Sequence, residues 1–256
     1  MTMNGLERRY ARQLLVPEMD EAKQARLAEM SVGIIGVGGL GCHIAPALAA
    51  AGIGCLHLMD DDLVSESNLP RQWLYHNHHI GAPKVHCCAD FIRQHRPDVR
   101  VTTHAMRMNE AALAECQHTS GRFDLLIDAS DNLTTRQAAN RFAHNANCPL
   151  ITAAVAGWQG HVAFFDFGLN ASPCYECVVG QQSLPSCLED GVFGPMAAWV
   201  ASCAALMAIK WMIGLGQSPL WVQMDGRTMT QKVFSIQPDP QCSVCGETSH
   251  DHRADQ

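Results

Sequence analysis

The feature that most constrains the fold is a glycine-rich turn between a short apolar strand and an alanine-rich helix. Ser31 to Ile35 reads SVGII, a β-branched run typical of a buried strand, and it leads directly into the turn Gly36 to Gly41. We expect a helix over Leu40 to Ala51 and a second strand over Cys55 to Met59, which ends at the acidic triplet Asp60 to Asp62. A strand, a helix and a strand in this order predict a βαβ unit with parallel strands.

The alternation of strands and helices continues to about residue 155 and then changes character. Apolar patterning predicts three more helices and three more strands, over Ala82–His95, Asn109–Cys116 and Thr134–Asn145, and over Val99–His104, Phe123–Ala129 and Leu150–Ala154. Later segments alternate apolar and polar residues like antiparallel strands, namely His161–Phe167 and a strand pair within Leu220–Ile236. The prediction is an α/β, Rossmann-like nucleotide-binding fold in one domain, with a mixed sheet that is parallel in its N-terminal part and antiparallel in its C-terminal part.

Composition and charge exclude several classes of protein. Apolar residues form 47% of the 256, and 18 basic against 25 acidic residues give a net charge of −7. A negative chain binds phosphate backbones poorly, so we expect no nucleic acid as a partner. Met1 to Leu15 has no apolar signal-peptide core, so we expect a cytoplasmic protein without disulfides. Most of the cysteines outside CxxC pairs are then expected to be plain buried thiols: Cys42, Cys55, Cys87, Cys88, Cys116, Cys148 and Cys203.

One uncharged stretch is long enough to cross a membrane. Gly191 to Ile209 carries no charged residue, but it contains glycine, proline, serine and six alanines and is only mildly apolar. We therefore expect a buried or dimer-interface helix that starts near Pro195, and no membrane.

The glycine turn has the composition of a phosphate-binding loop. Gly36, Gly38, Gly39 and Gly41 allow the backbone to approach a phosphate closely, and free N–H groups at the start of the following helix face the anion. Asp60 lies 19 residues beyond Gly41, at the end of the second strand, where a carboxylate can accept hydrogen bonds from ribose hydroxyls. NAD, FAD and ATP all fit this pattern, and a tight turn without a ligand is the alternative.

Two basic residues downstream favour a triphosphate. Arg71 and Lys84 can neutralise charge on the β- and γ-phosphates while the α-phosphate is attacked, and a dehydrogenase does not need them. Asp131 follows the strand Phe123–Ala129 and is a candidate ligand for Mg²⁺. The alternatives are a solvated arginine and lysine, and an aspartate that caps the next helix.

Four cysteines form two CxxC pairs separated by 64 residues, Cys174 with Cys177 and Cys242 with Cys245. Two such pairs can supply four thiolates to one tetrahedral Zn²⁺, which would act as a clip for the C-terminal segment. A pair of redox-active CxxC sites is the alternative. Between the pairs, Cys187 lies in a polar stretch and is a candidate nucleophile, although the acidic residues beside it oppose formation of a thiolate.

These motifs, in this order, resemble the ThiF/MoeB/HesA family, the bacterial relatives of ubiquitin-activating enzymes. The resemblance spans Arg9 to Gly246 and is slightly closer to the ThiF branch. It rests on Arg9-Tyr10-Ala11-Arg12-Gln13, the glycine turn, Asp60–Asp62, Ser67-Asn68-Leu69-Pro70-Arg71-Gln72, Lys84, Asp128-Ala129-Ser130-Asp131-Asn132, the CxxC pairs and Cys187-Leu188-Glu189-Asp190-Gly191. The sequence departs from the family pattern at Pro70, where the family has glutamine, and at Ala129-Ser130, where the family has Cys-Thr. Both departures leave the charged groups in place.

The resemblance implies a nucleotidyltransferase that uses ATP to adenylate the C-terminal glycine of a ubiquitin-like sulfur carrier protein ending in Gly-Gly. Pyrophosphate is released, and sulfur then replaces AMP to give a thiocarboxylate. Thiamine (thiazole) biosynthesis is the implied pathway, and the small subunit of molybdopterin synthase, another carrier, a peptide or RNA are the alternative substrates. No rhodanese domain follows Gly246, so we expect a separate sulfur donor, a cysteine desulfurase or a rhodanese-type protein.

The resemblance also implies roles for single residues. The nucleotide would be bound by Gly36, Gly38, Gly39, Gly41, Asp60, Asp62, Asn68, Arg71, Gln72, Lys84 and Asp131, with Asp60 on the ribose and Asp131 on Mg²⁺. Catalysis would involve Arg71, Lys84, Asp131, Arg12 reaching into the other subunit of a homodimer, and Cys187 forming a covalent link to the carrier. Cys174, Cys177, Cys242 and Cys245 would hold structural zinc. The implied division is a helical arm over 1–30, a nucleotide-binding part over 31–155 and a carrier-binding and zinc-binding part over 156–256.

Two further classes of protein share parts of this pattern. A nicotinamide-dependent oxidoreductase would use the same glycine turn, and NADH binding would distinguish it. A non-catalytic module would keep the nucleotide fold without turnover, which the presence of Arg71, Lys84 and Asp131 disfavours.

Overall fold

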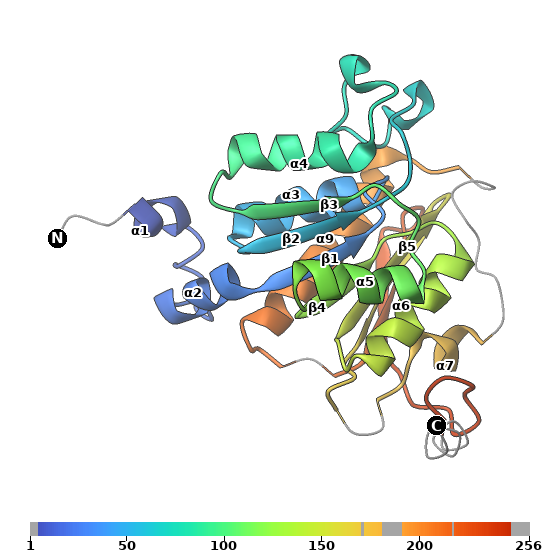
Figure 1. Cartoon of the computed structure of the whole chain (residues 1–256). Helices are drawn as coiled ribbons and strands as arrows, with labels where there is room; N and C mark the ends of the chain where they lie inside the picture. The colour runs from blue at the N-terminus through green and yellow to red at the C-terminus, as the bar shows by residue number, and fades with distance from the viewer. Residues whose placement is uncertain (1–4, 170–171, 181–190, 217, 247–256) are drawn as a thin grey trace.

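In the computed structural model, an eight-stranded mixed sheet carries helices on both faces (Figure 1). The structure describes residues 5–169, 172–180, 191–216 and 218–246. Strands β3, β2, β1, β4 and β5 are neighbours in this order and run parallel, and β6, β7 and β8 continue the sheet antiparallel. The predicted mixed sheet is confirmed. The strands are β1 Ser31–Ile35, β2 Cys55–Met59, β3 Arg100–His104, β4 Leu125–Asp128, β5 Leu150–Ala156, β6 Gln159–Phe165, β7 Leu220–Asp225 and β8 Thr230–Ser235.

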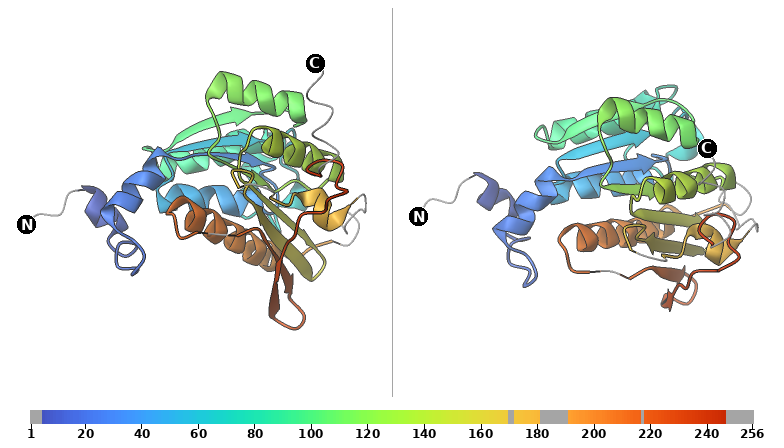
Figure 2. Two further views of the ribbon diagram at one scale, coloured as in Figure 1. Left: turned by 90° about the horizontal axis from the view of Figure 1, so that it is seen from below. Right: turned by 60° about the horizontal axis from the view of Figure 1, so that its bottom comes forward.

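The helices form two layers, because side chains of each buried strand point alternately to the two faces of the sheet. Ile34 packs in the core under α3, α4 and α9, whereas its neighbour Ile35 packs in the core under α5, α6 and α7. Figure 2 shows helices on the two sides of the sheet. The helices are α1 Gly5–Tyr10, α2 Glu21–Glu29, α3 Gly41–Ala51, α4 Lys84–His95, α5 Glu110–Ser120, α6 Leu133–Asn145, α7 Tyr175–Val179 and α9 Gly194–Met212, with 3-10 turns η1 Glu66–Asn68 and η2 Asn77–His79. Six of the seven cysteines expected in the core are buried, and Cys203 is half-buried.

All the predicted elements are present, and the differences lie at their ends. Ala156 pairs with Gln159 across a tight turn, so β5 extends two residues beyond the prediction and β6 starts two residues before it. The turn is possible because Gly157 adopts φ +54°. Helix α5 runs four residues past Cys116, since the chain meets no helix-ending residue before Gly121, which has φ +102°.

The order of the strands creates a switch point between β1 and β4. The chain adds β2 and β3 on one side of β1 and then returns to place β4 on the other side. The connections after β1 and β4 therefore leave in opposite directions, and ligands of open α/β sheets bind in the crevice at such a point.

Helix α9 is the only helix in the described ranges that is long and apolar enough to cross a membrane, by length and composition alone. Half of this stretch is buried inside the molecule, where α9 packs against α3, β5 and β6. A Cβ atom at Gly160 of β6 would lie 2.3 Å from Val200 Cγ2, so the helix rests directly on the sheet. This contact accounts for the apolar face of α9, which starts at Gly194 beside Pro195 as predicted.

Candidate active site

A cavity of about 620 Å³ opens at the carboxyl edge of the parallel strands, at the switch point. Of the predicted nucleotide-binding residues, only Gly41 does not line it: the lining includes Gly36, Gly38, Gly39, Asp60, Asp62, Asn68, Arg71, Gln72, Lys84 and Asp131. These residues come from segments up to 95 positions apart, as from Gly36 to Asp131. The fold thus gathers them at one place.

The glycine turn is tightly packed against its surroundings. Gly36 adopts φ +84°, and a Cβ atom there would lie 2.8 Å from the carbonyl oxygen of Ala129 in the loop after β4. A Cβ atom at Gly41 would lie only 1.9 Å from the Gly36 carbonyl oxygen. The absence of a side chain at Gly41 therefore allows the first turn of α3 to pack directly against the Gly36 carbonyl group.

Asp60 is tied to the glycine turn through its carboxylate. The Val37 N–H donates to Asp60 Oδ2 at 2.7 Å, and the Asp62 N–H donates to Asp60 Oδ1 at 2.8 Å. Burial raises the pKa of Asp60, while the nearby Lys84 opposes this shift. Each carboxylate oxygen keeps a free lone pair, so Asp60 can still accept hydrogen bonds from a ligand in the cavity.

Both predicted cations line the cavity. Lys84 is only 4% exposed, and its Nζ forms an ion pair with Asp62 Oδ2 at 2.6 Å. Arg71 is held by a backbone group, since its Nη1 donates to the Ser67 carbonyl oxygen at 2.7 Å. Gln72 is 2% exposed, and its Oε1 has no partner among the residues the structure describes. A ligand with anionic and donor groups would satisfy this set.

Asp131 lies free at the end of β4 rather than capping a helix. The side chain of Asn132 caps α6, accepting the Thr135 N–H at 2.9 Å. Asp131 is exposed to the cavity and makes no hydrogen bond or ion pair with the described part of the chain. A free carboxylate that faces a cavity is a suitable ligand for Mg²⁺.

An ion pair that the sequence did not reveal lies beneath Asp131. Arg136 Nε donates to Asp128 Oδ2 at 2.8 Å, and the two side chains are 6% and 0% exposed. Tyr175, which is also fully buried, completes this wall of the cavity. The one sequence signal was an acid, Asp128, at the end of an otherwise apolar strand, since such a buried carboxylate needs a cationic partner.

A second cavity of about 710 Å³ lies over β5, β6 and β7 and adjoins the first. Ala154, Val155 and Val192 line both cavities. The second cavity carries polar groups such as Gln223 and the exposed aromatic rings of Trp158 and Phe193. A chain segment lying over the antiparallel strands could therefore reach the first cavity.

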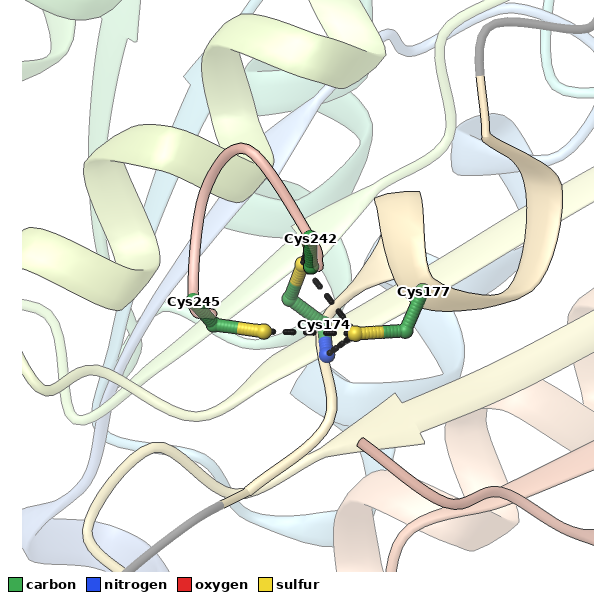
Figure 3. Close-up of side chains that lie close together, drawn as sticks. All are labelled: Cys174, Cys177, Cys242 and Cys245. Atoms are coloured by element: carbon green, nitrogen blue, oxygen red, sulfur yellow. Dashed lines mark hydrogen bonds between the residues drawn. The ribbon is translucent and has the colours of Figure 1, made fainter. Parts of the chain in front are cut away.

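The four CxxC cysteines, far apart in sequence, meet in one cluster (Figure 3). Their Sγ atoms all lie within 4.8 Å of one another, with Cys177 3.2 Å from Cys245 and Cys174 3.5 Å from Cys242. Sulfurs around a tetrahedral zinc, at about 2.3 Å from the metal, lie about 3.8 Å apart. Backbone N–H groups of Cys174 and Asp239 point at Cys177 Sγ, each at 3.4 Å, and support a thiolate there. The cluster thus fits a zinc clip.

Two predicted residues lie elsewhere. Arg12 is on the N-terminal arm after α1, outside the set that lines the cavity of its own chain. Cys187 falls outside the described residues.

The fold and the cavity together define an α/β nucleotide-binding protein of the Rossmann-like type. The sequence model of the ThiF family matches residues 10–244, and the chain belongs to this family. It is 34% identical over 244 residues to the molybdopterin-synthase adenylyltransferase of Escherichia coli, covering 93% of this chain and 96% of that protein. It is also 34% identical over 249 residues to the sulfur carrier protein adenylyltransferase of Thermus thermophilus, covering 93% and 90%. The chain is an enzyme of the nucleotidyltransferase class.

A solved structure shares the fold. E. coli MccB in complex with MccA-N7isoAsn superimposes with a TM-score of 0.81 at 24% sequence identity, covering 95% of this chain and 76% of that one. The Rossmann-like sheet and its antiparallel extension are therefore a common scaffold.

Proposed function

We propose that the protein uses ATP to adenylate the C-terminal carboxylate of a ubiquitin-like sulfur carrier protein. The observation that carries the proposal is the grouping of Asp60, Arg71, Lys84 and Asp131 in one cavity at the glycine turn. The names of the two relatives support both the reaction and the kind of substrate.

In this reaction, an oxygen of the carrier's terminal carboxylate attacks the α-phosphate of ATP. The bond to the bridging oxygen of the β-phosphate breaks, pyrophosphate leaves, and an acyl adenylate remains. Arg71 and Lys84 stabilise the charge that develops on the phosphates, and Asp60 holds the ribose. Asp131 would hold Mg²⁺, which neutralises phosphate charge when bound. The terminal sulfur of a donor persulfide then displaces AMP and forms an acyl disulfide, and a thiol cleaves the S–S bond to release the thiocarboxylate as a new disulfide forms.

The second cavity supports delivery of an extended carrier tail. It joins the nucleotide cavity along Ala154 and Val155, which belong to β5, so a tail lying over β6 and β7 would place its last residue near the α-phosphate. We therefore assign nucleotide binding to residues 31–155 and carrier and zinc binding to residues 156–256. Arg12, on the arm outside the cavity, is proposed to complete the site of the other subunit in a homodimer.

Two carriers are candidates. The acidic triplet Asp60–Asp62, the segment Leu150–Ala153 and Asp225-Gly226 resemble the thiamine branch and favour the thiamine-pathway carrier. The identity to the molybdopterin-synthase adenylyltransferase favours the small subunit of molybdopterin synthase equally.

ATP–pyrophosphate exchange with purified protein and Mg²⁺ tests the proposal. Each carrier is added in turn, intact and without its terminal glycine. Exchange with one intact carrier, and none with its truncated form, is the expected result and identifies the pathway. Equal ATP consumption without any carrier would refute carrier adenylation.

A further inference from the structure

We infer that the cysteine cluster and the nucleotide cavity are energetically coupled through Tyr175 and Arg136, with Arg136 acting as a positioning residue for the Asp131 loop. The inference rests on the proposed function for its two ligands, zinc and ATP. It concerns the residues between them, which lie on α6 and α7.

Arg136 holds the peptide that precedes Asp131. Its Nη2 donates to the Ser130 carbonyl oxygen at 2.6 Å and to the Ala153 carbonyl oxygen at 3.1 Å, in addition to the ion pair with Asp128. Asp128 in turn accepts the Ser130 N–H at 3.0 Å. Ser130, the residue before Asp131, is thus held through both its N–H group and its carbonyl group. The Ala153 carbonyl lies on β5, next to Ala154, where the two cavities join. Because the guanidinium offers five donors in a rigid plane, it fixes these acceptors relative to one another.

Tyr175 connects Arg136 to the cysteine cluster. The Arg136 guanidinium lies 5.8 Å from the centre of the Tyr175 ring, and Tyr175 is 1% exposed and lines the nucleotide cavity. It directly follows Cys174, whose Sγ belongs to the cluster. A shift of Cys174 therefore moves a wall of the cavity.

Asn140 makes the connection rigid. It lies four residues after Arg136, so both side chains project from the same face of α6. Asn140 Oδ1 accepts the Tyr175 N–H at 2.9 Å, and Asn140 Nδ2 donates to Glu176. Asn140 is fully buried, so α7 cannot move without breaking buried hydrogen bonds or moving α6.

The expected consequence is that zinc and the nucleotide strengthen each other's binding. If zinc orders Cys174 and Tyr175, it also orders Arg136 and the Asp131 loop, and the nucleotide with Mg²⁺ must then stabilise bound zinc by the same factor. If the zinc site only fastened the C-terminal segment, its affinity for zinc would not depend on the nucleotide.

The zinc affinity, measured by equilibrium competition with a chromophoric chelator, tests the coupling without carrier and without turnover. ATP with Mg²⁺ at saturation should raise the zinc affinity of the wild-type protein at least about fivefold, the lower end of typical allosteric factors. If titration shows nucleotide binding while the zinc affinity is unchanged, the coupling alone is overturned. A protein that binds no ATP, or no zinc, overturns both the coupling and the corresponding part of the proposed function.

Variants test which residues transmit the coupling. Tyr175→Leu keeps an apolar side chain but removes the contact with Arg136. It should reduce the effect of ATP on zinc affinity to less than about twofold while both ligands still bind. Arg136→Lys keeps the charge beside Asp128 but not the planar set of donors, and it should raise the Mg²⁺ concentration for half-maximal exchange. Arg141→Gln is the matched control, since Arg141 is on the same helix in a partly exposed ion pair with Glu110. An undiminished effect of ATP on the zinc affinity of Tyr175→Leu overturns the assigned path.

Discussion

Replacing Lys84 by methionine should abolish most of the activity and leave the fold intact. Methionine has nearly the same length and suits a site that is 4% exposed, so packing is preserved. The partner of Lys84 in the ion pair is Asp62, whose side chain is 64% exposed. Asp62 can be solvated when the lysine is gone, so we expect a loss of unfolding free energy of about 1 kcal/mol or less.

The effect on catalysis should be much larger. A preorganised charge aimed at a developing phosphate charge contributes about 2.7–4 kcal/mol, which is a factor of about 10²–10³ in kcat. Lys84 fits this description because Asp62 and the start of α4 hold it in place before ATP binds. The expected result is a loss of that size in carrier-dependent ATP–pyrophosphate exchange.

Arg93→Met provides the matched control. Arg93 is on the same helix, α4, and pairs with Asp90 at 3.2 Å, with both side chains at least half exposed. This variant should exchange pyrophosphate at the wild-type rate. If Lys84→Met unfolds at the wild-type temperature and keeps more than about a third of the wild-type rate, the electrostatic role of Lys84 is refuted.

Other predictions follow from close contacts, burial and the cysteine cluster. Gly41→Ala places a Cβ atom 1.9 Å from the Gly36 carbonyl oxygen, so it should cost about 1–3 kcal/mol in urea unfolding and weaken ATP binding; unchanged values of both would contradict the tight packing of the turn. Burial, with a smaller contribution from Arg136, lowers the pKa of His161 from 6.5 to about 3, so stability that is present above pH 6.5 should be lost as the pH falls toward 3. Between pH 6 and pH 4, the unfolding free energy of His161→Gln should fall by about 1.4 kcal/mol less per pH unit than that of the wild type. Identical slopes of unfolding free energy against pH would refute the assignment. Cys242→Ser should reduce the bound zinc from about one ion per chain to nearly none in elemental analysis, and retained zinc would contradict the four-thiolate site.

Local chemistry explains why much of the fold was predictable. Several features depend only on neighbours within a few residues: the glycine turn, the acid after β2 and the apolar runs of β1 and β4. The spacing of apolar residues along the chain therefore predicts them directly. The ends of β5 and β6 were misplaced because a hairpin register depends on pairing between Ala156 and Gln159, which alternation within one strand does not reveal.

The sequence by itself determined the class of fold, the family resemblance and the kinds of residue available for a nucleotide and a metal. Only the tertiary structure decided which of them meet. Arg136 has the pattern of an ordinary helix residue, yet it is buried because β4 places a carboxylate, Asp128, beneath it. Burial of a charge depends on what surrounds it in three dimensions, and the strand order that brings β4 beside β1 and α6 beside α7 is set by non-local packing.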